Sequence, residues 1–83
     1  MKIHTLLAKN VRLYRRRLGY SQDRLAEECS MIAQEDALAN RSYISDVENS
    51  RRNITLDKVG ILARALHVEP FRLFLTEEPT ERM

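Results

Sequence analysis

Residues 21–27 read Ser-Gln-Asp-Arg-Leu-Ala-Glu, and residues 41–49 read Arg-Ser-Tyr-Ile-Ser-Asp-Val-Glu-Asn. Each stretch has the pattern of a short amphipathic helix with a good start signal. Ser21 is a favourable N-cap, and Asp23 follows in the first turn, where the helix dipole stabilises an acid. Asn40 is a second N-cap candidate, and an apolar face of Tyr43, Ile44 and Val47 follows it. The sequence therefore predicts a helix opening at Ser21 and a short helix over about 41–48.

The flanking sequence is also helical in pattern. Apolar residues recur at three-and-four spacing over about 5–18, with Thr5 as a plausible cap and Gly19 as the stop. Thr55 caps a further helix that keeps its period up to His67, and a last helix begins at Glu69-Pro70. No stretch alternates with period two for long, so strands are not expected. The prediction is an all-α domain of five short helices.

Length and composition indicate one small compact domain. The 83 residues are 43% hydrophobic and 31% charged, with 2 Gly and 2 Pro. We expect this domain to cover residues 1–76, with a flexible polar tail over 77–83. The apolar runs are too short for a membrane span or a signal peptide, so we expect neither membrane association nor secretion.

Catalytic and metal chemistry have little support in the sequence. A single cysteine, Cys29, forms neither an internal disulfide nor a cysteine-based metal cage, which favours a reducing, cytoplasmic setting. His4 and His67 are each solitary, and no Gly-rich phosphate loop or metal-ligand spacing is present. We expect no enzymatic activity, no metal site and no cofactor.

Charge is unevenly distributed along the chain. The net charge is only +2, but residues 1–22 carry six Lys or Arg and no acid, whereas residues 23–40 carry five acids and one Arg. Such segregation in a small domain favours a face that meets a polyanion such as nucleic acid. A solvated basic face is the alternative interpretation.

Three blocks together resemble a known family. They are the two stretches quoted above and a third made of Leu-Ala-Arg-Ala-Leu-His-Val at 62–68 with Phe-Arg-Leu-Phe at 71–74. In this order they resemble the Cro and phage-repressor helix-turn-helix family, also called the XRE family, over about residues 6 to 75. The resemblance implies a five-helix, lambda-repressor-like domain whose second motif helix enters the major groove of double-stranded DNA.

The resemblance also implies roles for individual residues. Gln22 would bind a backbone phosphate, and the second motif helix would read bases from Arg41, Ser42, Ser45 and Asp46. For Arg41 a guanine edge and a phosphate both remain open; Asp46 would accept from cytosine or orient an arginine, and Tyr43 would contact a phosphate or cover the core. The expected DNA-binding set is Gln22, Asn40, Arg41, Ser42, Tyr43, Ser45, Asp46, Asn49, Arg51, Arg52 and Asn53.

Some positions are better interpreted as structural. The resemblance implies an ion pair between Glu48 and Arg15, which leaves Arg12, Arg16 and Arg17 for solvent or phosphate. Ser50 stands where the family usually has glycine in a left-handed turn. The segment between the motif helices is longer than is usual and lacks Gly and Pro, which favours a longer second helix or an added helical turn. Residues 30–39 would then be a spacer or a contact for a protein partner.

These observations predict a sequence-specific transcriptional regulator that binds a palindromic operator as a homodimer and controls its own gene. A restriction-modification controller, a phage repressor and an antitoxin all fit. The alternative function is an antitoxin or interaction module that binds and neutralises a protein partner. The dimer contact is expected at apolar residues near the C-terminus, for which burial in the monomer core is the competing role: Leu66, Val68, Phe71, Phe74 and Leu75.

Overall fold

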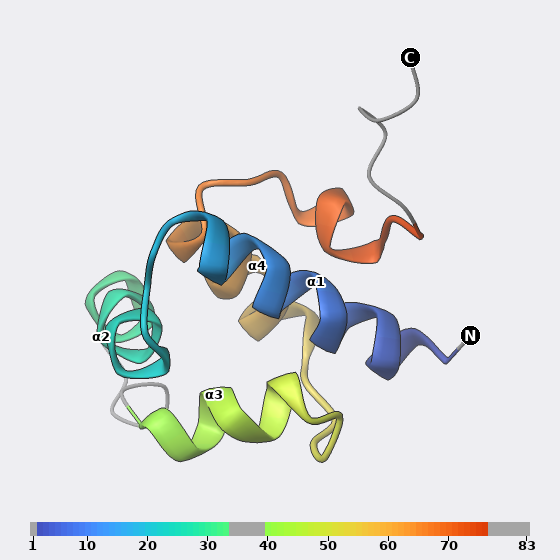
Figure 1. The fold of residues 1–83 in the computed structure, drawn as a ribbon, viewed down its shortest axis with the longest axis horizontal. Coiled ribbons are helices and arrows are strands. Elements are labelled where there is room, and N and C mark those ends of the chain that lie inside the picture. Colours follow the sequence, from blue (N-terminus) through green and yellow to red (C-terminus); the bar gives the residue numbers. More distant parts are fainter. Residues whose placement is uncertain (1, 34–39, 77–83) are drawn as a thin grey trace.

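The computed structural model describes residues 2–33 and 40–76, and these form a small helical domain (Figure 1). Four α-helices follow one another: α1 over Ile3–Arg17, α2 over Gln22–Ala33, α3 over Arg41–Glu48 and α4 over Leu56–Ala65. A short 3₁₀ helix, η2, covers Pro70–Phe74. The described residues contain no strand, so the all-helical prediction is confirmed for that part of the chain. The tail predicted at 77–83 lies outside the described residues.

The predicted count of five α-helices is not confirmed, because the last segment is a 3₁₀ helix. Glu69 before it and Leu75 after it are both extended, which leaves only five residues between them. Its closing bonds span three residues, from the N–H of Arg72 to the carbonyl of Glu69 and from the N–H of Leu75 to that of Arg72. A segment this short favours the tighter helix.

Polar caps start three of the α-helices as predicted. The hydroxyl of Ser21 accepts from the N–H of Arg24 at 3.0 Å, and the side chain of Asn40 accepts from the N–H of Ser42 at 2.7 Å. Thr55 caps α4 in the same way. Each such cap satisfies an N–H group that has no partner inside the helix.

The start of α1 differs from the prediction. The helix begins at Ile3, and Thr5 lies inside its first turn instead of capping it. Lys2 occupies the cap position without a side-chain cap bond, and its carbonyl accepts from the N–H groups of Thr5 and Leu6 at 3.1 Å. The backbone of Lys2 thus begins the helix, and the first turn contains no acid.

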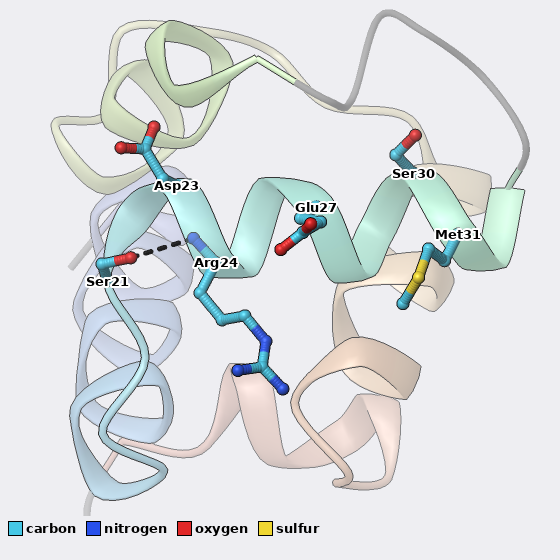
Figure 2. Close-up of a pocket in the computed structure, with 6 residues that line it drawn as sticks. All are labelled: Ser21, Asp23, Arg24, Glu27, Ser30 and Met31. Atoms are coloured by element: carbon cyan, nitrogen blue, oxygen red, sulfur yellow. Dashed lines mark hydrogen bonds between the residues drawn. The ribbon is translucent and has the colours of Figure 1, made fainter.

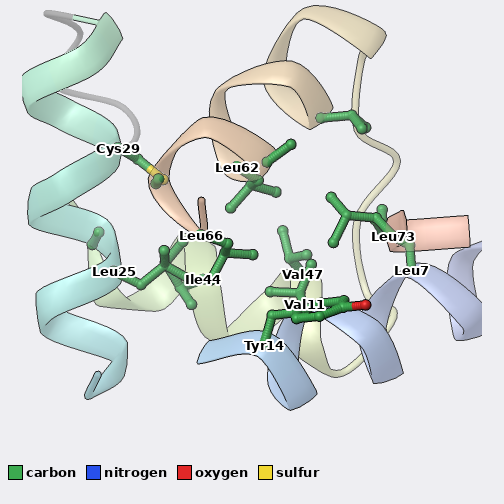
Figure 3. Close-up of a cluster of buried hydrophobic side chains, with 14 of the residues drawn as sticks. Leu7, Val11, Tyr14, Leu25, Cys29, Ile44, Val47, Leu62, Leu66 and Leu73 are labelled. Atoms are coloured by element: carbon green, nitrogen blue, oxygen red, sulfur yellow. The ribbon is translucent and has the colours of Figure 1, made fainter. Parts of the chain in front are cut away.

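The core lies where all five elements meet (Figure 3). Cys29 belongs to it, and burial raises the pKa of its thiol to about 12, so the side chain stays neutral and packs as a small apolar residue. Asn10 is also buried, and its amide donates to the carbonyls of Leu73 and Leu75, which fixes η2 on α1. The largest fully buried side chains are Leu25, Ile44, Leu62, Leu66, Leu73, Val11 and Cys29.

One buried carboxylate joins three helices. The side chain of Glu48, at the end of α3, is 1% exposed. It accepts hydrogen bonds from Nε and Nη2 of Arg15 on α1 and, at 3.1 Å, from the amide of Gln22 on α2. Arg15 also donates to the carbonyl of Tyr20 at 2.8 Å, in the turn between α1 and α2. The expected pair of Arg15 and Glu48 is therefore present and extends into the α1–α2 turn.

Arg12 also belongs to this cluster. Its guanidinium donates to the backbone carbonyl of Glu48 at 2.9 Å, and its Nε lies 3.7 Å from the carboxylate. The expectation that Arg12 is left for solvent or phosphate is wrong. Arg12 lies one turn before Arg15 on α1, so both arginines reach the same end of α3.

Within residues 2–33 and 40–76, two residues other than glycine have a left-handed backbone. Ser50 has φ +59° and His67 has φ +61°. Ser50 thus keeps the conformation for which the family usually has glycine. Such a conformation costs an L-residue roughly 1–2 kcal/mol.

Removing the charge of Glu48 should destabilise the fold strongly. Glu48→Gln leaves two arginines without their buried partner, and we expect the free energy of unfolding to fall by about 3 kcal/mol. Urea denaturation at neutral pH measures this change. The control is Glu28→Gln, because Glu28 pairs with Arg24 on the exposed side of α2 and should lose less than about 1 kcal/mol. Equal losses for both variants would contradict the structural role of Glu48.

The backbone strain at position 67 should be relieved by glycine. We expect His67→Gly to raise the free energy of unfolding by about 1 kcal/mol, since glycine adopts a positive φ freely. Gly19→Ala is the opposite test, because Gly19 has φ +74° with open space around it, so only the backbone resists the change. Thermal unfolding should move up for the first variant and down for the second. Two shifts of the same sign would show that backbone strain at a positive φ does not determine how these substitutions change stability.

Candidate nucleic-acid interface

The N-terminal ends of α2 and α3 lie close together. The two helices pack against each other, and Nε of Arg41, the first residue of α3, donates to the side-chain oxygen of Gln22, the first residue of α2, at 3.3 Å. Both side chains therefore meet at one edge of the domain. This is the arrangement in which a helix-turn-helix presents two helix starts to a DNA duplex.

Gln22 connects this edge to the interior. Its amide nitrogen donates to Glu48 at 3.1 Å while its oxygen accepts from Arg41. One N–H of the amide remains for a phosphate, the role expected from the sequence. The bridge itself was not predicted, because no sequence signal relates residues 19 and 26 positions apart through a shared amide.

The outward side of α3 carries the residues expected to read bases. Arg41 and Ser42 are exposed, and Ser45 and Asp46 are half-buried. Asn40, just before them, is exposed but its side-chain oxygen is used by the cap. A guanidinium and two hydroxyl groups thus lie along one side of a short helix, within reach of a groove.

The far end of α3 is organised around Arg52. Its guanidinium lies 3.3 Å from the carboxylate of Asp46 and 4.7 Å from the ring centre of Tyr43. Of the roles left open for Asp46, the structure contains the pairing with an arginine, and the arginine is Arg52 instead of Arg41. Tyr43 is buried and belongs to the core cluster.

The loop after α3 is exposed and tied to the helix. The side chain of Asn49 donates to the carbonyl of Ser45 at 2.8 Å, and the backbone N–H of Arg51 donates to the carbonyl of Asp46 at 2.8 Å. Asn53 is exposed as well. These contacts hold a polar, basic loop beside α3, where the family resemblance predicts phosphate contacts.

The residues expected at a dimer contact fall into two groups. Leu66 is 2% exposed and part of the core, which is the competing role considered from the sequence. Phe71 is 57% exposed, and the other three are half-buried: Val68, Phe74 and Leu75.

Two exposed apolar residues escaped the sequence analysis. Ile3 is 56% exposed and Leu56 is 83% exposed. Both line an apolar hollow of about 150 Å³ together with Phe74, and the remaining lining residues are His4, Leu7, Ile54 and Val59. Leu56 fits the three-and-four spacing of the apolar residues in α4, so its exposure could not be predicted from the sequence.

The outer face of α2 carries the described part of the long segment between the motif helices. Ser30 and Met31 continue α2 to Ala33, so the second helix is extended as expected, and residues 34–39 lie outside the described residues. Figure 2 shows these two side chains on the same face as Ser21, Asp23, Arg24 and Glu27, around an open depression of about 580 Å³. Arg24 on this face is bound to Glu28 at 2.9 Å, and this hydrogen bond raises its pKa.

The part of the chain that the structure covers offers little for other chemistry. Within residues 2–33 and 40–76 no three His, Cys, Asp or Glu side chains gather as metal ligands. None of the helices in these ranges has the length and apolarity that crossing a bilayer requires.

Comparison with known proteins agrees with this geometry. A family described as a helix-turn-helix domain matches residues 6–72. A "Neisseria hypothetical transcription factor" of Neisseria meningitidis serogroup B is 37% identical over 81 residues, 98% of this chain and 67% of that protein. "Control protein C.SmaI" of Serratia marcescens is 42% identical over 67 residues, 81% of this chain and 70% of its own. "Control protein C.BamHI" of Bacillus amyloliquefaciens is 36% identical over 69 residues, 82% and 75% of the two chains.

A solved structure is similar along nearly the whole chain. It is the crystal structure of the hypothetical transcription factor NHTF from Neisseria, with a TM-score of 0.78 and 37% identity, covering 98% of this chain and 82% of that one. The family match spans most of the chain, and the relatives are named as regulators of transcription or as control proteins. The chain therefore belongs to the XRE-like helix-turn-helix family, and it is a DNA-binding transcriptional regulator, not an enzyme.

Proposed function

We propose that this protein acts in the cytoplasm as a homodimer on a palindromic operator and controls its own gene, in the manner of a restriction-modification controller or a phage repressor. We assign this function to residues 1–76. Two relatives that are named control proteins support the hypothesis of a restriction-modification controller. The observation that carries the proposal is the exposed guanidinium of Arg41, held by Gln22 at the start of α3.

Arg41 is the residue we assign to base recognition. A guanidinium matches the two acceptors of a guanine edge in the major groove, and its bond to Gln22 leaves both terminal nitrogens of the guanidinium available. Ser42 and Ser45 on the same side of α3 complete the surface that faces the bases. Gln22, with its remaining N–H, contacts a phosphate at the edge of the groove.

The other part of the interface, around Arg52, contacts the DNA backbone. Asp46 orients Arg52 through their 3.3 Å contact, so Arg52 points along the edge of α3 toward a phosphate. Because that pair is exposed, it contributes little to stability and gives way to a phosphate at low cost. The other residues assigned to this part of the interface are Asn40, Tyr43, Asn49, Arg51 and Asn53.

The homodimer follows from the small size of one reading surface. A single α3 contacts too few bases for useful specificity, and two copies related by a twofold axis read half-sites about one helical turn apart. The apolar face of Ile3, Leu56 and Phe74 around one hollow supports a contact between copies, since apolar side chains that gather at a surface mark interaction sites.

Replacing Arg41 should change specificity. Arg41→Ala is expected to lose discrimination at one base pair per half-site, with a cost of about 1–3 kcal/mol for each. Selection of bound sequences from a random duplex pool, for wild type and variant at the same salt concentration, measures this. Arg52→Ala is the matched contrast, because loss of a phosphate contact weakens all duplexes alike and lowers the salt dependence. An unchanged sequence preference for Arg41→Ala would refute its base contact.

A charge on the apolar face should separate the two copies. Leu56→Glu is expected to give a monomer that keeps its fold, because Leu56 is exposed and contributes little to the monomer core. Sedimentation equilibrium should show the change in mass, and affinity for the full palindrome should fall to that for a half-site. Met31→Glu on α2 is the control, since Met31 is 61% exposed and lies away from this face. A dimeric Leu56→Glu protein would place the contact between copies elsewhere.

A further inference from the structure

A basic hollow lies where the first turn of α1 meets the loop after α3. Its volume is about 410 Å³, and its walls come from two segments nearly fifty residues apart in sequence. Figure 1 shows the N-terminal turn of α1 and this loop on the same side of the molecule. Three of the lining residues are bases, none is an acid, and the full set is Lys2, His4, Thr5, Ser50, Arg51, Arg52 and Asn53.

The two walls are joined and fixed to α3. The hydroxyl of Ser50 donates to the carbonyl of His4 at 3.4 Å, which links the loop to α1. Asp46 binds the loop to the end of α3: its carbonyl accepts from the N–H of Arg51, and its carboxylate pairs with the side chain of Arg52. The hollow therefore has a set position relative to the helix that reads the bases.

The start of α1 is suited to an anion. A lysine at the cap position of a helix is unfavourable beside the positive end of the helix dipole, and here neither a side-chain cap nor an acid in the first turn compensates it. A negatively charged group in the hollow would meet the lysine, the positive end of the helix dipole and two arginines. The hydroxyl of Thr5 supplies a neutral donor of the kind that contacts phosphate oxygens.

We propose that this hollow binds one backbone phosphate of the DNA, so that Lys2, His4 and Thr5 extend the interface beyond α3 and its loop. The proposal rests on the proposed function. It adds a contact from the start of α1, where the family resemblance implies none.

The place of this phosphate on the operator follows from the neighbouring surface. His4 lines both the basic hollow and the apolar hollow at the proposed dimer face. The basic hollow thus lies between α3 and the second copy. We expect the phosphate that it binds to lie on the side of each half-site nearest the twofold axis.

The test uses operator duplexes in which one neutral methylphosphonate linkage replaces a phosphate at each backbone position in turn. Wild-type protein should lose about tenfold in affinity at one linkage on the inner side of each half-site. Lys2→Gln should bind the unmodified operator more weakly and lose nothing further at that linkage. The slope of the logarithm of its DNA affinity against the logarithm of salt concentration should become shallower by about 0.9 for each protomer on the DNA. Arg64→Gln, which removes an exposed charge on α4 outside the hollow, should behave as wild type.

The outcomes separate the possibilities. A Lys2→Gln profile identical to that of wild type at every linkage overturns the proposal. If, in addition, inorganic phosphate shifts the amide resonances around the hollow in a saturable way, the hollow holds a free anion and not DNA. If wild type does not distinguish the operator from a scrambled duplex, the proposed function fails, whatever Lys2→Gln does. If wild type distinguishes them but no inner linkage depends on Lys2, only the basic hollow is refuted.

Discussion

The carboxylate of Glu48 is the interaction on which the rest of the structure depends. It is buried, and its partners come from α1 and α2 while it belongs to α3 itself. A buried charge is tolerable only when it is hydrogen-bonded and paired; here Arg15 and the amide of Gln22 donate to the carboxylate, and the charge of Arg12 lies 3.7 Å away. The orientation of α3 relative to α1 and α2 is therefore fixed by electrostatics as well as by apolar packing.

The same carboxylate also controls the surface. Glu48 holds Gln22, and Gln22 holds Arg41, so a chain of hydrogen bonds runs from the interior to an exposed guanidinium. An unrestrained arginine loses considerable side-chain entropy when it binds. We propose that Arg41 reads bases, and restraining its side chain before DNA binds reduces that loss.

Much of the fold was predictable, because local signals determine it. The caps at Ser21, Asn40 and Thr55 act within four residues of themselves, and the bounds of α3 were predicted correctly for that reason. The start of α1 was not, since Lys2 begins the helix through its backbone, which no side-chain signal reveals. The base-reading surface stays a prediction from the family resemblance. Its internal connections, from Gln22 to Arg41 and from Asp46 to Arg52, depend on side chains that meet only after the helices have packed.

Ser50 shows how a departure from a family pattern acquires a physical reason once the fold is known. Glycine would adopt the left-handed turn without strain, and serine gives up roughly 1 kcal/mol to adopt it. Serine adds a hydroxyl, which donates to the carbonyl of His4. Ser50 also lines the basic hollow. One weak hydrogen bond offsets only part of the strain. The remaining strain is the cost of a bond that joins the loop to α1 and so fixes the two walls of the basic hollow relative to each other.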